Sequence, residues 1–311
     1  MSELTFREGR ASDLEAVYEL GETAWDESRR ARGLIDERRP GEELREGWAR
    51  DRPLVEFVTA QPGCFLVCEL EDELVGYVVV ARFGGMDEMA ELWVAPEHAG
   101  RGVSRGLLER CWPKSPTREL ARLVVAVGRP ADLTLFTEFG VMPVTGHWHM
   151  RHRVDEYLEH RALERDSTDP DVHVLTAERA VEEWKRLEPG AISHERPALH
   201  EFFGRTRNCL ATVDEDGRAT ALCWVSNHGE IGPGVGNGPE DLVPVVLAAL
   251  DRVAKMQEPE TFGVYCTTAS WWLMDRLRRL GFKVYWPAWV MSSVPLPGLD
   301  RYLPTRPVRL L

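Results

Sequence analysis

ELWVAPEHAGRGVSRGLLERC, residues 91–111, is the stretch that decides the fold of this chain. An apolar run ends in Val-Ala-Pro, a turn containing Gly100 and Gly102 follows, and a Leu-Leu pattern then indicates a helix. A strand that passes through glycines into a helix N-terminus gathers unpaired backbone N–H groups, which form a ready site for an anion. The stretch therefore predicts a phosphate-binding turn, because small residues let the backbone approach phosphates closely.

The sequence around this turn predicts a regular alternation of strands and helices. The charged segment Glu71–Glu73 separates two apolar runs and predicts a hairpin, and Ser12 or Asp13 is a suitable N-cap for the first helix. Strands are expected at residues 5–9, 64–69, 74–83, 86–94, 120–127 and 144–153. Helices are expected from residue 12, at 42–59 with an interruption near Pro53, at 104–112 and at 130–139.

A polar, charged segment follows the last of these strands and ends in Asp-Pro. It predicts a linker over residues 154–171 with one or two helical turns, between domains at 1–153 and 172–311. The same order of hairpin, strand, helix, strand, helix and strand returns in the second half. LTLFTEFGV at 133–141 and MDRLRRLGF at 274–282 each predict a short helix that ends at glycine before a strand. We therefore expect a duplicated α/β fold (α+β by some schemes) of mixed, mostly antiparallel sheets flanked by helices.

Composition limits the possible partners. The formal net charge of −13 and the pI of about 5.3 disfavour nonspecific binding to nucleic acid or to an anionic membrane. The N-terminal residues MSELTFREGR show no signal-peptide pattern, and no run is long enough for a membrane helix. Six scattered cysteines without a C-x-x-C pair indicate reduced, mostly buried thiols. We expect a cytoplasmic monomer or homodimer.

The first half resembles the GCN5-related N-acetyltransferase (GNAT) family. The resemblance covers roughly residues 3–153 and is carried by Val94-Ala95-Pro96, Gly100–Ser104, Leu107-Leu108 and Leu135–Gly140. The Gln/Arg-x-x-Gly-x-Gly/Ala motif of the family falls on residues 99–104, where Gly102 and Ser104 fit and Ala99 replaces Gln or Arg. The resemblance implies that acetyl-CoA or another acyl-CoA is the co-substrate. It also implies that Leu92, Trp93 and Val94 pair with the pantetheine arm, and that the pyrophosphate is held by Gly100, Arg101, Gly102, Val103, Ser104 and Arg105.

The second half is similar to a degenerate copy of the same domain. Its counterpart of the phosphate turn is GPGVGNGPEDL, residues 232–242, which is rich in glycine but lacks the motif spacing and any positive charge. We expect a non-catalytic domain that shapes or covers the active one; binding of a nucleotide-like cofactor is the alternative.

Two glutamates are candidates for the general base. An amine must be neutral to attack a thioester, so a nearby carboxylate would help, and some GNAT proteins carry a catalytic glutamate on the strand that holds Glu88 and Glu91. Because side chains alternate along a strand, these two should point to opposite faces unless a bulge intervenes. We expect direct attack by an amine of a small molecule, with Glu88 or Glu91 as base and backbone amides near Val94 polarising the thioester. Surface charges at a strand edge are the alternative.

Three residues depart from the family pattern. Ala99 removes one phosphate contact, for which Arg101 and Arg105 could supply charge. Phe136 occupies the place of a tyrosine that protonates the departing thiolate in many members, and Arg129 stands near a frequent asparagine. These departures support a second hypothesis, a non-catalytic acyl-CoA-binding or regulatory module with a decayed site; a different coenzyme A chemistry is a third.

Other clusters leave alternatives open. His147 and His149 share a strand face, which is compatible with a metal, an acceptor pocket or a face near solvent; no metal site is expected. The arginines at 29, 30, 32, 38 and 39 fit an anionic acceptor or a solvated loop. A further set of aromatic residues fits an acceptor pocket or packing: Trp25, Trp48, Trp271, Trp272, Trp286 and Trp289.

Overall fold

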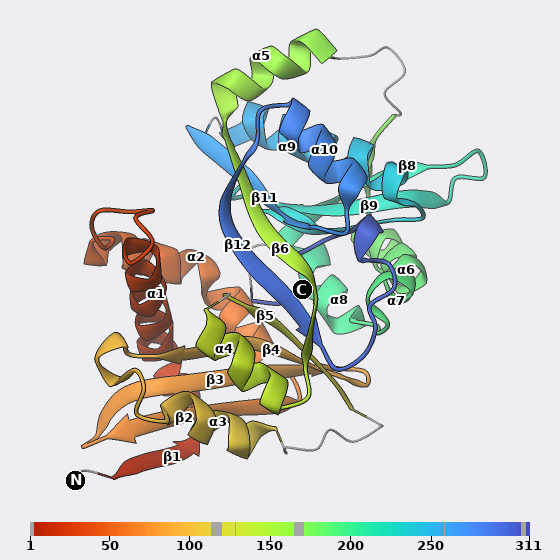
Figure 1. Ribbon diagram of the computed structural model, residues 1–311. Helices are drawn as coiled ribbons and strands as arrows, with labels where there is room; N and C mark the ends of the chain where they lie inside the picture. The colour runs from red at the N-terminus through yellow and green to blue at the C-terminus, as the bar shows by residue number, and fades with distance from the viewer. Residues whose placement is uncertain (1–2, 113–119, 128, 165–170, 258, 306–308) are drawn as a thin grey trace. The chain divides into compact units, whose positions relative to one another are not determined.

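The computed structural model describes residues 3–112, 120–127, 129–164, 171–257, 259–305 and 309–311 (Figure 1). The chain forms two compact units. The first unit comprises Met1–Arg122 with Thr137–Gly140, and the second comprises Leu123–Phe136 with Val141–Leu311. The domain boundaries predicted at residues 153 and 172 stay a prediction.

The first unit contains an antiparallel sheet between helices. Its strands pair in the order β1 (Leu4–Glu8), β2 (Gly63–Leu70), β3 (Glu73–Phe83) and β4 (Met86–Val94). Helix α1 (Leu14–Arg30) covers the face of Tyr77, and α3 (Val103–Cys111) covers the opposite face, where Gly76 lies against Val103 (Figure 1). Helix α2 (Gly41–Thr59) packs beside α1 through Tyr18 and Val55. Two 3₁₀ turns complete the unit, η1 (Ala11–Asp13) and η2 (Pro96–His98).

The second unit holds two sheets. Residues 123–126 of β5 (Ala121–Ala126) pair with β12 (Lys283–Ser292), which pairs with β6 (Met142–Arg153), which pairs with β11 (Thr261–Thr267). The other sheet follows the order β13 (Tyr302–Leu303), β10 (Ile231–Gly236), β9 (Ala219–Ser226), β8 (Arg207–Val213) and β7 (His173–Leu175). Each of these strand pairs is antiparallel.

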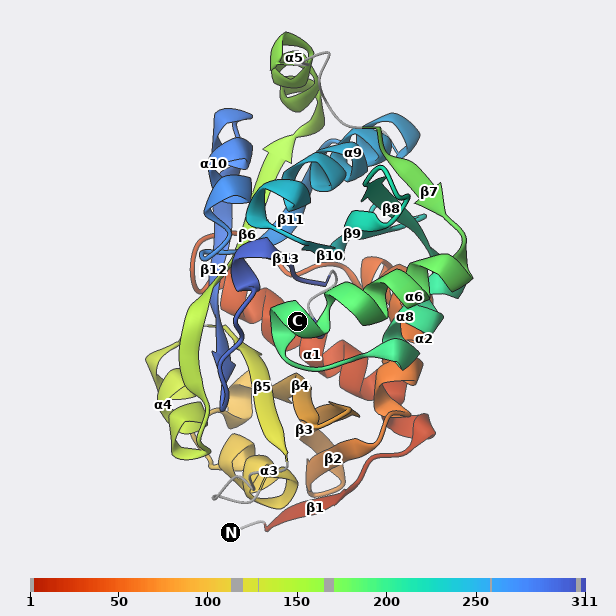
Figure 2. The same cartoon turned by 90° about the vertical axis from the view of Figure 1, so that its right-hand side faces the viewer.

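Helix α9 (Pro239–Gln257) is the centre of the main core of the second unit. It shares a buried cluster with Cys223 of β9 and with α10 (Trp271–Arg279). The next residue of β9, Trp224, points to the other face, where α6 (Ala177–Leu187) and α8 (Pro197–Thr206) contact it through Trp184 and Phe203 (Figure 2). The remaining elements are α4 (Pro130–Glu138), α5 (Val154–Glu164), α7 (Pro189–Ile192) and η3 (Leu299–Arg301).

Several local expectations need correction. The predicted linker at 154–171 begins with the 11-residue helix α5, about three turns, rather than one or two, and residues 165–170 lie outside the described residues. Helix α2 continues through Pro53 without a break. Helix α8 was missed although Pro197 stands at its first turn and Leu199 and Phe203 form its buried face.

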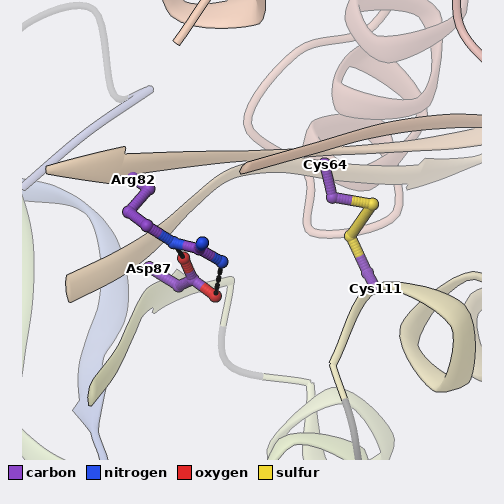
Figure 3. The surroundings of a disulfide bond; sticks show 4 residues. All are labelled: Cys64, Arg82, Asp87 and Cys111. Atoms are coloured by element: carbon purple, nitrogen blue, oxygen red, sulfur yellow. Dashed lines mark hydrogen bonds and ion pairs between the residues drawn. A yellow bond between two sulfur atoms is a disulfide. The ribbon is translucent and has the colours of Figure 1, made fainter. Parts of the chain in front are cut away.

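The expectation that the cysteines are all reduced is wrong for two of them. Cys64 at the start of β2 and Cys111 at the end of α3 form a disulfide, with their Cα atoms 5.9 Å apart (Figure 3). The bond connects the sheet to the helix that begins at the glycine turn. Cysteines 68, 209, 223 and 266 are buried thiols, as expected. Burial raises the pKa of the Cys68 thiol to about 11.

Candidate active site

The glycine turn opens toward solvent at the N-terminus of α3. Gly100 and Gly102 have φ values of 79° and 85°, a left-handed backbone that residues with a Cβ rarely adopt. A Cβ built at either glycine would meet no atom of the described residues within 4 Å. The side of the turn that each Cβ would occupy is therefore free for a ligand to approach the backbone.

Helix α3 is held firmly behind this turn. Val103, Leu107 and Leu108 are buried, and a Cβ at Gly106 would lie 2.4 Å from the Phe6 ring, so the helix backbone approaches β1 closely. The first N–H groups of a helix have no acceptor within the helix, and the helix dipole places positive charge at the same end. The predicted residues from Gly100 to Arg105 thus form one continuous turn and helix start that favours an anion.

The side chains of this turn add less charge than the sequence suggested. Arg101 is exposed, whereas Arg105 forms a two-point ion pair with Glu138 at 2.7 and 3.1 Å. Ala99 ends the η2 turn and contributes only a methyl group. Backbone amides, with Arg101 beside them, are the main source of positive potential here.

A β-bulge decides where the two candidate bases point. Val80 pairs with Met89 while Val79 pairs with Glu91, so Ala90 is an extra residue in β4. Glu88 lies opposite Ala81 and Glu91 opposite Val79, and these two partners share one face of β3. Glu88 and Glu91 therefore point to the same face. The opposite faces expected of a regular strand are not found, because the bulge that was the stated exception is present, and Glu88 is 1% exposed.

Glu91 is half-buried and hydrogen-bonded. The hydroxyl of Tyr77 donates to Glu91 Oε2 at 2.6 Å. Helix α1 passes directly over this pair at Gly21, where a Cβ would lie 2.3 Å from the Tyr77 hydroxyl. Tyr77 and Gly21 were missed in the sequence, because the strand alternation without a bulge places Glu91 on the other face from Tyr77.

Tryptophans flank the glutamate on the same face of the sheet. Trp93, two residues after Glu91, lies against Gly21, and its ring meets that of Trp25 edge-on with centroids 6.2 Å apart. Both indoles are half-buried. Trp48 instead packs against Tyr18. Trp271 and Trp272 are largely exposed in the second unit, and Trp286 is buried there.

The arginines at the end of α1 and in the segment that follows it are mostly neutralised by acids of α1. Arg29 and Arg39 both bind the buried Asp26, while Arg30 and Arg38 both bind Glu27. Burial alone would raise the pKa of Asp26, but hydrogen bonds from Arg39 and Arg29 outweigh it and keep the pKa below its usual value. This arrangement favours a structural role for these four arginines over recognition of an anionic acceptor.

The glycine-rich turn of the second unit is closed. The N–H of Gly238 donates to Asp241 Oδ2 at 2.9 Å, so an acid of the chain itself occupies the N-terminus of α9. A Cβ at Gly236 would lie 2.7 Å from the carbonyl oxygen of Gly238. The contrast with Gly100 and Gly102 favours a second unit that does not hold phosphates.

The histidines of β6 are buried rather than near solvent. His147 and His149 are 1% and 8% exposed, and each stacks against the Tyr265 ring, with ring centroids 4.9 and 4.6 Å apart. Burial lowers the pKa of His147 to about 3, so its imidazole is neutral near pH 7. Among the described residues, no group of three or more His, Cys, Asp or Glu side chains could hold a metal ion. Within that same part of the chain, no helix is long and apolar enough to span a bilayer.

The protein family and the curated relative that match part of this chain are both acetyltransferases. Residues 61–139 match the model of the acetyltransferase (GNAT) domain family. An acetyltransferase of Photorhabdus laumondii is 32% identical over 79 residues, which are 25% of this chain and 55% of that relative. The match thus spans about half the length of the curated relative.

Solved structures share the fold across nearly the whole chain. A candidate acetyltransferase from Pyrococcus horikoshii matches with a TM-score of 0.70 at 16% identity, over 99% of this chain and 96% of that one. A tandem GNAT protein from the clavulanic acid biosynthesis pathway matches with a TM-score of 0.60 at 15% identity, over 94% and 99%. The predicted fold class, mostly antiparallel sheets flanked by helices, is confirmed.

Proposed function

We propose that this chain, whose residues 61–139 match the acetyltransferase (GNAT) domain, transfers an acyl group from acyl-CoA to an amine through its first unit. The acyl group is acetyl in the simplest case, and the acceptor is a small molecule. The observation that carries the proposal is the open, left-handed turn at Gly100 and Gly102 on the N-terminus of α3.

The turn would hold the pyrophosphate of the co-substrate by backbone N–H groups from Gly100 to Arg105, helped by the helix dipole. Leu92, Trp93 and Val94, which end β4, would pair with the pantetheine arm. The thioester would then lie near the strand that carries Glu91, which is the condition for a general base to act on the acceptor.

The chemistry is one displacement. The amine nitrogen attacks the thioester carbonyl carbon, the carbon–sulfur bond breaks, and the coenzyme A thiolate leaves with the bonding electron pair. Glu91 takes the proton that the nitrogen loses, since it is half-buried, whereas Glu88 on the same face is buried. Phe136 cannot donate a proton, so water protonates the thiolate in this scheme. A carboxylate base contributes about 100- to 10,000-fold to such a step.

A second function has one observation in its favour. Phe136 is 5% exposed and stands where many family members carry a proton-donating tyrosine. A non-catalytic acyl-CoA-binding or regulatory module would retain the open turn and lose the acid. The closed turn at Gly238 supports the second unit as a non-catalytic partner under either function.

The test measures thiol release from acetyl-CoA by the purified chain with a panel of small amines, amino acids and polyamines. Turnover with one class of amine supports the enzyme, and Glu91→Gln should lower kcat at least about 100-fold. Glu88→Gln tests the buried alternative, and Glu73→Gln, at the exposed start of β3, is the control for loss of a carboxylate. Saturable binding of acetyl-CoA without release under any condition would support the binding module instead.

A further inference from the structure

We propose that Tyr77 is a positioning residue, which fixes the carboxylate of Glu91 for its role as base, and that Gly21 is glycine because it makes room for the Tyr77 hydroxyl. The inference rests on the proposed acyl transfer. It adds two residues, one on β3 and one on α1, that the family motif does not include.

The first step is the geometry of the pair. Tyr77 lies opposite Trp93 in the β3–β4 ladder, and Val79 lies opposite Glu91, so Tyr77 and Glu91 are diagonal neighbours on one face. Diagonal neighbours are within reach of long and aromatic side chains. The hydroxyl of Tyr77, a residue 2% exposed, donates to Glu91 Oε2 at 2.6 Å, a short bond of the charge-assisted kind.

The second step is the cover over the pair. Gly21 lies within the 17-residue helix α1, where glycine costs about 1 kcal/mol relative to alanine. A Cβ there would lie 2.3 Å from the Tyr77 hydroxyl, but 3.3 Å from Trp93 Cδ1 and 3.4 Å from Glu91 Oε2. The hydroxyl is therefore the one of these three atoms that a methyl group would displace outright.

The third step is the chemical consequence. A hydrogen bond to an ionised carboxylate favours the ionised form, which is the form that accepts a proton. The bond also holds Glu91 Oε2 at a fixed place on this face of the sheet. Without the hydroxyl, the carboxylate loses this stabilisation of its ionised form and this hydrogen-bond partner.

A double-mutant cycle tests this arrangement. Tyr77→Phe should lower kcat on the order of tenfold, leave the KM for acetyl-CoA unchanged, and move the acidic limb of the pH–rate profile to higher pH. Gly21→Ala should do the same, because its methyl group pushes the hydroxyl away. The double variant should be no worse than Tyr77→Phe, since the phenyl ring leaves the space that the methyl group needs.

The chain contains a matched control. The Tyr18 hydroxyl donates to Asp51 Oδ2 at 3.1 Å, and a Cβ at Gly47 of α2 would lie 2.6 Å from that hydroxyl. Tyr18→Phe and Gly47→Ala thus impose a similar structural change at a hydrogen bond whose acceptor is Asp51 and not Glu91. They should lower thermal stability and leave the pH–rate profile in place.

The outcomes separate the two proposals. A wild-type chain that releases no coenzyme A with any amine overturns the acyl transfer and this inference together. An active wild type whose Tyr77→Phe variant keeps the same profile and kcat leaves the function standing and overturns the positioning role. A double variant impaired by the product of the two single effects overturns the explanation for Gly21.

Discussion

Replacing Gly102 by alanine should weaken acetyl-CoA binding much more than it weakens the fold. Gly102 is the N-cap of α3 with φ 85° and ψ 5°, and an added Cβ would meet no atom of the described residues within 4 Å. The stability cost is therefore only that of a left-handed backbone for a residue with a Cβ, about 1–2 kcal/mol. No steric clash adds to it.

The effect on binding follows from where the new methyl group would stand. It would occupy the open side of the turn, where phosphate oxygens must approach the backbone of Gly102 and Val103. Loss of one hydrogen bond to a charged group costs about 1.5–3 kcal/mol, which corresponds to a dissociation constant about 10- to 150-fold higher.

Calorimetric titration with acetyl-CoA, together with urea unfolding, measures both effects. Gly33→Ala is the matched control, because Gly33 has φ 69°, has no described atom within 4 Å of its Cβ position, and lies outside the turn. Both variants should lose similar stability, and only Gly102→Ala should lose affinity. Wild-type affinity in Gly102→Ala, or equal losses of affinity in both variants, would refute the role of the turn.

Three further predictions concern stability. Glu188→Gln should lower the free energy of unfolding by about 3–5 kcal/mol, because the buried Arg196 guanidinium, 2.7 Å from Glu188, loses its counter-charge. Burial alone would raise the pKa of Glu188, but Arg196 and His200 hold this pKa well below the ordinary 4.5. The stability advantage of the wild type over the variant should therefore shrink as the pH falls below 4.5, which urea titrations at pH 7 and pH 4 measure. Replacing both Cys64 and Cys111 by serine removes a covalent link between residues 47 positions apart and should lower the free energy of unfolding, measured by urea titration, by about 4 kcal/mol. An unchanged urea midpoint would contradict this prediction. In His147→Phe, the Tm should fall less between pH 7 and pH 5 than it does in the wild type. Burial lowers the pKa of His147 from 6.5 to about 3, so in this pH range only the unfolded wild-type chain takes up a proton at His147 and the folded state is destabilised. A Tm that falls as steeply in the variant as in the wild type would count against this role.

The glycines at helix ends show which features follow from sequence. Gly140 and Gly281 have φ values of 80° and 90° and end α4 and α10, as the two similar segments predicted. The N–H groups of Val141 and Phe282 each bond to a carbonyl five residues earlier, at 3.3 and 3.0 Å. Such caps depend on a few neighbouring residues, so their signal is complete within a short segment.

The arrangement of the candidate site was less accessible. The bounds of β4 were predicted correctly, yet the faces of Glu88 and Glu91 were not, because one extra residue at Ala90 reverses every face after it. The same insertion brings Glu91 to the side of Tyr77. A bulge carries no reliable local signature, since any of several residues in a strand can accommodate it.

The sequence by itself thus determined the strand, glycine turn and helix at residues 86–111 and their resemblance to the GNAT domain, because each is encoded by residues close together in the chain. Only the tertiary structure decided that Glu91 meets Tyr77 beneath Gly21 and that Cys64 meets Cys111. Tyr77 and Glu91 are 14 positions apart, and Cys64 and Cys111 are 47 positions apart. Their contacts therefore depend on strand register and helix packing, which no local preference specifies.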